Sequence, residues 1–265
     1  MKNILDNAPD LEIPPCPVAD EFKPRPCEAC GTMLEPYFYR YPFSRNLWEV
    51  AANSHWCGPP QFCESCREKR EAKRMHEERI MTILKECKFK ERQRNMTLDN
   101  FKPCHPSHKK ILAALCSYAP DNGKNVLLHG AVGRGKTHLI IGLVKKLILE
   151  EKICQARFVT GINLLRLIKA GFSPAVYHSS DYVIDYHAEM PLLIIDDLGL
   201  EKPSEWAIET LYTIIDERYS GFRPTFITSN MNPMQLAARL DDRLMSRLLH
   251  DALVLKIEGK DYRIS

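Results

Sequence analysis

The sequence predicts an α/β protein in which a parallel β-sheet is flanked by helices, together with a small N-terminal module of different construction. Three short, largely apolar or β-branched runs, at residues 126–128, 192–195 and 225–228, are separated by stretches long enough to hold helices. Continuous runs of this kind are typical of parallel strands that are buried on both faces. Pairs of closely spaced cysteines occur only near the N-terminus, which indicates the second module.

The first run leads directly into a phosphate-binding motif. Residues 130–137, Gly-Ala-Val-Gly-Arg-Gly-Lys-Thr, match G-x-x-x-x-G-K-[ST] at every fixed position. Such a loop wraps nucleotide phosphates with its backbone N–H groups, its lysine reaches the β and γ oxygens, and its hydroxyl holds Mg²⁺. A helix that begins at the lysine adds the positive end of its dipole. We therefore predict that ATP and Mg²⁺ are bound by Gly130, Gly133, Gly135, Lys136 and Thr137.

The second run ends in two acids, Asp196 and Asp197. The carboxyl ends of parallel strands are where open α/β sheets bind their ligands, so both carboxylates are expected beside the phosphate loop. We predict that Asp196 coordinates Mg²⁺, directly or through water, and that Asp197 polarises the attacking water. Many such ATPases carry a longer glutamate at the second position, so the aspartate favours slow hydrolysis.

The third run ends at Ser229 and Asn230. Asn230 is therefore the predicted polar sensor that orients water against the γ-phosphate. Farther along, Arg243 and Arg247 are four residues apart and so share one helix face. One of them could reach the γ-phosphate of a neighbouring subunit as an arginine finger, which would make hydrolysis depend on self-assembly. Two solvated arginines on a surface helix are the alternative.

The N-terminal cysteines predict a zinc site. Cys27 and Cys30 form one C-x-x-C pair, and Cys63 and Cys66 form a second pair after an aromatic-rich insert. Each pair offers two thiolates to a tetrahedral ion, and a segment this short cannot bury enough apolar surface to fold unaided. Four thiolates leave no open position, so the zinc would be structural. Disulfides are the rival explanation, and His55 or Cys57 could replace the fourth ligand.

Composition and charge bound the remaining possibilities. The chain has 265 residues, 45% hydrophobic content and a net charge of +3, which fits one core domain with an appendage. We expect a zinc module at residues 1–66, a basic helical linker at 67–96 and an ATPase domain at 97–265. From Arg67 to Asn95, eleven Lys and Arg face six Asp and Glu. A solvated helix explains this excess, and a DNA-backbone contact is the alternative. No signal core or membrane-length run is seen, so we expect a cytoplasmic protein without a membrane partner.

The motifs and their order resemble the AAA+ ATPases of the DnaC/DnaI helicase-loader and IstB transposition-helper group, over about residues 97–263. The resemblance rests on Leu98-Asp99-Asn100-Phe101, the phosphate loop, Leu193 to Gly199, Arg218-Tyr219, Thr228-Ser229-Asn230, Arg243 to Arg247, and Asp261-Tyr262-Arg263. It implies that Arg247 is the arginine finger and that Arg263 is a sensor contacting its own nucleotide. It also implies that the fold has no C-terminal helical lid. By the same analogy, Phe101 could line the base pocket.

The stretch between Thr160 and Met190 is long for a simple crossover and predicts two helices. In the proteins that the chain resembles, an extra helix here tracks single-stranded DNA. Arg166 and Lys169 would then contact phosphates, and the aromatic residues Phe172, Tyr177 and Tyr182 could stack on bases or belong to the core.

We therefore expect an ATP-dependent loader of a replicative DNA helicase, with the zinc module holding the helicase and ATP driving assembly on single-stranded DNA. Two alternatives stay open. The chain could be an IstB-like helper that remodels DNA and recruits a transposase, or a binding module that ATP switches without hydrolysis.

Overall fold

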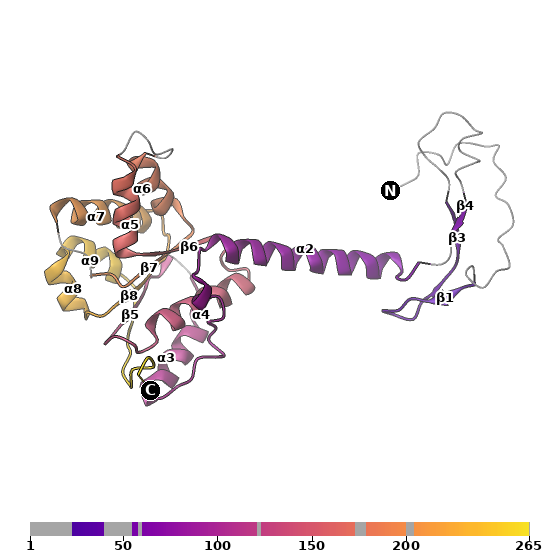
Figure 1. Cartoon of the computed structure of the whole chain (residues 1–265), viewed down its shortest axis with the longest axis horizontal. Coiled ribbons are helices and arrows are strands. Elements are labelled where there is room, and N and C mark those ends of the chain that lie inside the picture. Colours follow the sequence, from indigo (N-terminus) through magenta and orange to yellow (C-terminus); the bar gives the residue numbers. More distant parts are fainter. Residues whose placement is uncertain are drawn as a thin grey trace. The chain divides into compact units, whose positions relative to one another are not determined.

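The computed structural model describes residues 23–39, 55–57, 60–120, 123–172, 179–199 and 204–264. The chain divides into two compact units, residues 1–78 and 79–265. Figure 1 labels the elements and colours them along the sequence, from indigo at the N-terminus to yellow at the C-terminus.

The described part of the first unit consists of two small antiparallel sheets and the start of a helix. β1 (Arg25–Pro26) pairs with β2 (Met33–Leu34), and β3 (Tyr37–Tyr39) pairs with β4 (His55–Cys57). Of the residues described in this unit, only Cys27 is buried. Hydrophobic burial among these residues is therefore small.

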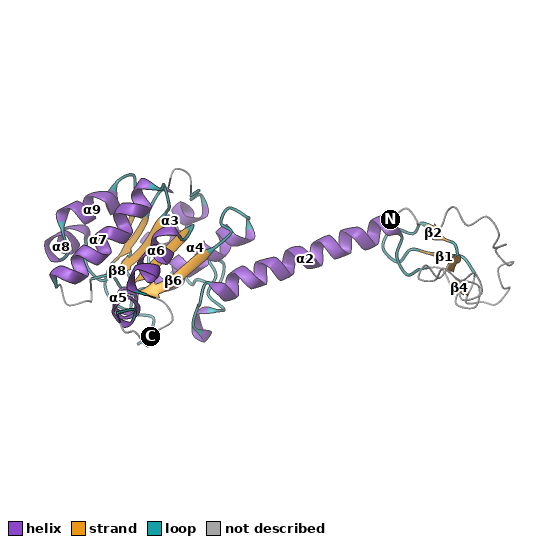
Figure 2. Ribbon diagram, turned by 90° about the horizontal axis from the view of Figure 1, so that it is seen from above, coloured by secondary structure: helices purple, strands orange, loops and turns teal. Residues whose placement is uncertain are grey.

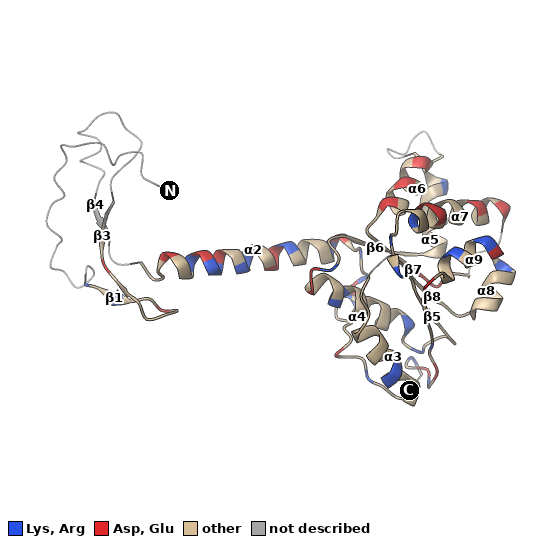
Figure 3. Cartoon of the chain, turned by 180° about the vertical axis from the view of Figure 1, so that it is seen from behind, with Lys and Arg blue, Asp and Glu red and all other residues tan. Residues whose placement is uncertain are grey.

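A long helix begins inside the second cysteine pair, directly after Cys63, and includes Cys66. α2 (Glu64–Glu86) contains no buried residue. Basic and acidic residues are interleaved along it (Figure 3), and Lys73 and Arg74 pair with Glu77 and Glu78 at 3.9 and 3.6 Å. Exposed pairs of this kind add little stability. The boundary between the compact units falls inside this helix, after Glu78.

The second unit is built on a five-stranded parallel sheet, as the sequence predicts. The spatial order is β6 (Ala156–Thr160), β7 (Leu192–Asp196), β8 (Thr225–Ser229), β5 (Val126–His129) and β9 (Leu253–Lys256). All four neighbouring pairs are parallel. The three predicted strands, β5, β7 and β8, lie side by side, so their carboxyl ends meet at one edge.

Helices cover both faces of this sheet (Figure 2). Two helices, α5 and α6, occupy the stretch between Thr160 and Met190, as predicted; Tyr177 lies outside the described residues. No helix in the described ranges is both long and apolar enough to cross a membrane. The helices are α3 (Pro106–Cys116), α4 (Lys136–Leu149), α5 (Gly161–Ala170), α6 (Ser180–Glu189), α7 (Glu205–Ser220), α8 (Pro233–Arg239) and α9 (Asp242–Leu249), and a short 3-10 turn, η2 (Glu91–Gln93), follows α2.

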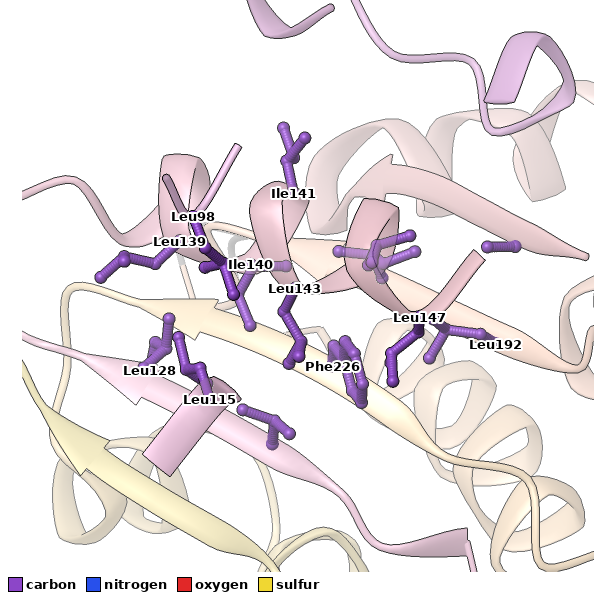
Figure 4. Close-up of a cluster of buried hydrophobic side chains, with 14 of the residues drawn as sticks. Leu98, Leu115, Leu128, Leu139, Ile140, Ile141, Leu143, Leu147, Leu192 and Phe226 are labelled. Carbon is purple, nitrogen blue, oxygen red and sulfur yellow. The ribbon is translucent and has the colours of Figure 1, made fainter. Parts of the chain in front are cut away.

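The sheet has a hydrophobic cluster on each face. Leu128 belongs to the cluster around α4, whereas its neighbour Leu127 belongs to the cluster around α5 and α7. This alternation follows from the two-residue period of a strand. In Figure 4, Leu143 and Leu147 of α4 lie against Phe226 of β8. The helix that begins at the phosphate loop is therefore anchored in the core.

Candidate nucleotide and metal sites

The phosphate loop connects β5 to α4 in the geometry that its glycines permit. Gly133 and Gly135 have φ angles of +75° and +88°, in the left-handed region that favours glycine. A Cβ atom on Gly135 would lie 2.6 Å from the ring of Phe101. Glycine is required there both for its backbone angle and for the close approach of an aromatic wall.

Lys136, the first residue of α4, is 5% exposed. Its Nζ donates hydrogen bonds to the carbonyl oxygens of Gly130 and Ala131 at 2.8 and 2.9 Å, and to Oδ1 of Asn230 at 2.7 Å. Burial lowers the pKa of Lys136, and the nearby carboxylates of Asp197 and Asp196 oppose that shift. The predicted sensor and the predicted phosphate-binding lysine are thus direct partners.

The Asp196 carboxylate joins the phosphate loop to the third predicted strand. Its Oδ1 accepts hydrogen bonds from the hydroxyls of Thr137 at 2.8 Å and Thr228 at 2.6 Å. Burial raises the pKa of Asp196, which is 5% exposed. A threonine hydroxyl and a carboxylate this close can both reach one Mg²⁺ ion, so the residues present suit that cation.

Thr228 has a role that the sequence reasoning did not assign. Its hydroxyl donates to Asp196 and also accepts a hydrogen bond from the backbone N–H of Asp197 at 2.9 Å. Asp197 itself has a φ of +55°, which is uncommon for a residue other than glycine. Thr228 therefore fixes the orientation of both acids. The sequence signal for this role was a polar residue, Thr228, near the end of a predicted apolar strand.

A pocket of about 620 Å³ opens beside these groups. Its lining includes the phosphate loop from Val132 to Thr137, together with Asp197, Asn230 and Arg263. Phe101 and Tyr262 form an aromatic wall, with ring centroids 5.7 Å apart. Arg263, the predicted sensor arginine, thus lies in the same pocket as the phosphate loop, and Phe101 lies where a base could pack.

The two arginines of α9 are not among the described residues that line this pocket. Arg247 forms an ion pair with Asp216 of α7, and its guanidinium lies 4.7 Å from the ring centroid of Tyr212. Arg243 pairs with Asp241 at 3.3 Å and lies 5.3 Å from the same ring. The predicted shared face is therefore present, and Tyr212 packs against both guanidinium groups.

The structure separates the two residues predicted to contact DNA. Arg166 faces a groove beside β6, whereas the ammonium of Lys169 lies 4.7 Å from the ring centroid of Trp206 on α7. Of the aromatic candidates, Phe172 is exposed and packs edge-on against Trp206, and Tyr182 is exposed on α6. Arg166 and Lys169 thus point to different surroundings on the same helix.

The four predicted metal ligands come together in the first unit. The Sγ atoms of Cys27, Cys30, Cys63 and Cys66 all lie within 4.8 Å of one another. The Cys30 and Cys63 sulfurs are 3.7 Å apart. A tetrahedral zinc with Zn–S bonds of ~2.3 Å requires sulfurs ~3.8 Å apart, so the arrangement fits that ion. The side chains of His55 and Cys57 lie outside the described residues.

Backbone geometry and charge support the same reading of the cysteines. The N–H of Cys63 points at the sulfur of Cys27 at 3.4 Å, and this hydrogen bond lowers the pKa of Cys27 to about 6. Hydrogen bonds with the neighbouring thiols, Cys63 first, raise the pKa of Cys66 to about 12. The thiol of Cys66 therefore resists ionisation, and a cation between the sulfurs would favour its thiolate form.

The second unit has the arrangement of an AAA+ nucleotide-binding protein, because a phosphate loop follows a central strand and polar side chains of two other parallel strands face it. The chain belongs to the family of IstB-like ATP-binding proteins, whose family model matches residues 50–265.

Curated relatives and solved structures agree with this assignment. A protein of Buchnera aphidicola subsp. Acyrthosiphon pisum named replicative helicase loader DnaC is 29% identical over 189 residues, which are 70% of this chain and 76% of that protein. The protein of the same name from Escherichia coli K12 is 24% identical over 64% of this chain and 69% of its own. A crystal structure of the DnaC helicase loader superposes with a TM-score of 0.57 at 26% identity, covering 64% of this chain and all of that one.

Proposed function

We propose that this protein is an ATP-dependent loader that places a replicative DNA helicase on single-stranded DNA. The similarity to proteins named as helicase loaders carries the proposal, since it spans 70% of the chain. The family model, which matches residues 50–265, includes the whole candidate nucleotide site. We further propose three functional parts: a zinc module at residues 1–66, a helical linker at 67–96 and an ATPase domain at 97–265.

ATP would lie in the pocket beside Phe101, with its phosphates wrapped by Gly130, Gly133 and Gly135. Lys136 would exchange its two loop-carbonyl partners for phosphate oxygens, because a buried ammonium gains more from an anion than from neutral carbonyls. Thr137 and Asp196 would hold the Mg²⁺, which when bound neutralises developing phosphate charge. Arg263 would contact the nucleotide of its own subunit.

Hydrolysis would use Asp197 and Asn230. Asp197 would accept a proton from the attacking water, while Asn230, which is already bonded to Lys136, would orient that water against the γ-phosphate. The side chain of Asp197 is short, and its backbone N–H is tied to Thr228. Slow turnover in the isolated protein follows from that short reach.

Arg247 would complete the site of a neighbouring copy when the protein assembles. It lies outside the lining of its own pocket, which is what an arginine that acts in trans requires. Its ion pair with Asp216 must then be exchanged for phosphate contacts, and Arg243 is the alternative finger on the same face. ATP hydrolysis would thereby depend on self-assembly.

The zinc module would hold the helicase. Zinc would act structurally there, because the four cysteines supply a complete tetrahedral set. The exposed helix α2 would connect this module to the ATPase domain and would have no role in catalysis.

The test uses the full-length protein and the purified replicative helicase of the same organism. With ATP and Mg²⁺, the parent is expected to bind the helicase and transfer it to circular single-stranded DNA, measured as DNA-bound helicase after gel filtration. Lys136→Ala should fail to transfer it, and Cys63→Ser with Cys66→Ser should fail to bind it while still binding ATP. A parent protein that binds no helicase would contradict the proposal.

A second candidate function follows from the family match itself, which is to IstB-like ATP-binding proteins. Such a helper would recruit a transposase instead of a helicase and use the same ATP site to remodel DNA. Replacing the helicase with a transposase in the same binding assay separates the two. Steady-state turnover with and without single-stranded DNA separates both from a switch that binds ATP without hydrolysing it.

A further inference from the structure

A cationic groove runs beside the edge strand of the sheet, away from the nucleotide pocket. We define it by the four basic residues in its lining, Lys88, Lys90, Arg157 and Arg166. It has a volume of about 390 Å³, and none of the described residues that line it is acidic. We propose that this groove binds the phosphate backbone of a single DNA strand.

The fold holds the four cations in place from three different segments. The backbone N–H of Phe158 on β6 donates to the carbonyl of Cys87 at 3.0 Å, and the rings of Phe89 and Phe158 pack edge to face at 5.8 Å. Cys87 and Phe89 are buried, whereas the intervening Lys88 and the following Lys90 are exposed. The alternation fixes this segment along the sheet edge with its lysines outward.

Lys88 also has a left-handed backbone conformation, which is usually adopted by glycine. It lies two residues after the end of α2 and has a φ of +60°, in the left-handed region where glycine is the usual residue after a helix. Lysine adopts this conformation less readily than glycine does. A cation is therefore present beside β6 at a position where local backbone preference alone favours glycine.

Arg157 and Arg166 both line the groove. The Nε of Arg157 is buried without a hydrogen-bond partner among the described residues, so this donor is unsatisfied inside the protein. No ion pair joins any of the four cations to a described acid, unlike Arg243 and Arg247 on α9. Arg166 shares its helix face with Asn163, one turn earlier, which also lines the groove.

An aromatic surface continues from the groove through Arg157. The Arg157 guanidinium lies 5.9 Å from the ring centroid of Tyr186, and Tyr186 stacks with Tyr182 at 6.4 Å and an interplanar angle of 21°. Both tyrosines are exposed. Proteins that bind single strands without sequence preference combine such a charged groove with aromatic faces for the bases, and a duplex offers no unstacked base to them. This combination favours a single strand as the occupant.

The inference rests on the proposed action at single-stranded DNA and specifies which residues make the contact. It moves the contact from a single helix carrying Arg166 and Lys169 to a groove shared by three segments. Lys169, whose ammonium lies on Trp206, becomes a natural control because it is a nearby exposed cation outside the groove.

The experiment measures fluorescence anisotropy of a labelled oligo-dT with the full-length protein across a salt series. Lys90→Glu with Arg166→Glu should weaken binding by at least about tenfold, and should reduce the slope of log affinity against log salt by roughly 0.7 for each lost phosphate contact. Lys169→Glu should change the affinity less than about twofold. Tyr182→Ala should weaken binding by roughly tenfold without changing the slope, because a stacked base carries no charge.

Equal binding by the parent and by the Lys90→Glu, Arg166→Glu variant would overturn the groove while leaving the proposed function standing. Equal loss in Lys169→Glu would return the contact to the helix alone and would also overturn it. A parent protein that binds no oligo-dT, with or without ATP, would remove the proposed action on single strands and the groove together. Unchanged binding of a fluorescent ATP analogue shows that each variant is folded.

Discussion

In residues 79–265 the candidate nucleotide site rests on five parallel strands with a hydrophobic cluster on each face, whereas in residues 1–78 four cysteines rest on strands of two or three residues. In the second unit, Lys136 is hydrogen-bonded to Asn230, and Asp196 is hydrogen-bonded to Thr137 and Thr228. In the first, Cys27 alone is buried among the described residues. The nucleotide site is therefore held by the core around it, whereas the four-cysteine site has to hold its own module together.

Removing the metal should produce the largest effect and should break only the first unit. Structural zinc contributes ~10–16 kcal/mol to the folding of small zinc domains. We expect a strong thiol-compatible chelator, or Cys63→Ser with Cys66→Ser, to unfold the module, seen as rapid proteolysis before α2 and loss of bound zinc by mass spectrometry. Cys116→Ser, at an exposed cysteine of α3, is the matched control. If the module stays resistant to protease after the metal is removed, zinc does not hold it together.

Lys136→Ala should abolish ATP turnover by the second unit and leave the fold of the first unit unchanged. The substitution removes a buried ammonium that bonds to Asn230 and faces the phosphate site, so ATP turnover is expected to fall at least about 100-fold. Zinc content should remain that of the parent. Lys146→Ala, on the same helix but paired with Glu150, is the control. Retained turnover in Lys136→Ala would show that the pocket is not the site of hydrolysis.

Acid should weaken the two units for different reasons. Burial lowers the pKa of His187 in the second unit from 6.5 to about 4. A histidine whose folded pKa is depressed stabilises the fold above its unfolded pKa, and this stability is lost as the pH falls from 6.5 to 4, by about 3 kcal/mol in all. His187→Leu should flatten that part of the stability curve, measured by urea unfolding at several pH values. In the first unit, acid would instead protonate the thiolates of the proposed zinc site and release its metal.

An unchanged acid slope in His187→Leu would assign the acid sensitivity of the second unit to other groups. Zinc release followed by mass spectrometry in the same buffers reports on the first unit independently.

Thr228→Val should have the smallest effect, and it tests whether Thr228 orients the two acids of the nucleotide site. Losing the hydroxyl that joins Asp196 to the backbone of Asp197 leaves one partly buried N–H unpaired, which costs ~1–3 kcal/mol. We expect a lower midpoint of unfolding in urea and weaker Mg²⁺-dependent turnover. Thr228→Ser should restore both. If Thr228→Val behaves like the parent, the two acids are oriented by other contacts.

Much of the second unit could be predicted because its signals are local. The phosphate loop is a contiguous motif, and β5, β7 and β8 are nearly continuous apolar runs. The two helices between Thr160 and Met190 also followed from length and periodicity. The four cysteines were predicted from spacing alone, since each C-x-x-C pair presents two sulfurs to one point.

Long-range contacts were beyond the reach of the sequence pattern. Thr228 read as an ordinary strand residue, yet it orients both acids because β7 and β8 are neighbours in the sheet. The sequence predicted that Arg166 and Lys169 act together. In the structure Lys169 instead lies over the ring of Trp206, which is 37 positions later in the chain.

The sequence by itself determined the phosphate loop, the acidic strand and the cysteine pairs, because each depends on residues a few positions apart. It also determined the membership of the ATP-binding family, because the motifs and their order along the chain are properties of the sequence. Only the tertiary structure decided that Asn230 bonds to Lys136, that Arg247 pairs with Asp216, and that Lys88 and Lys90 join Arg157 in one groove. These contacts depend on strand order and helix docking, which the packing of the whole core fixes and no single segment encodes.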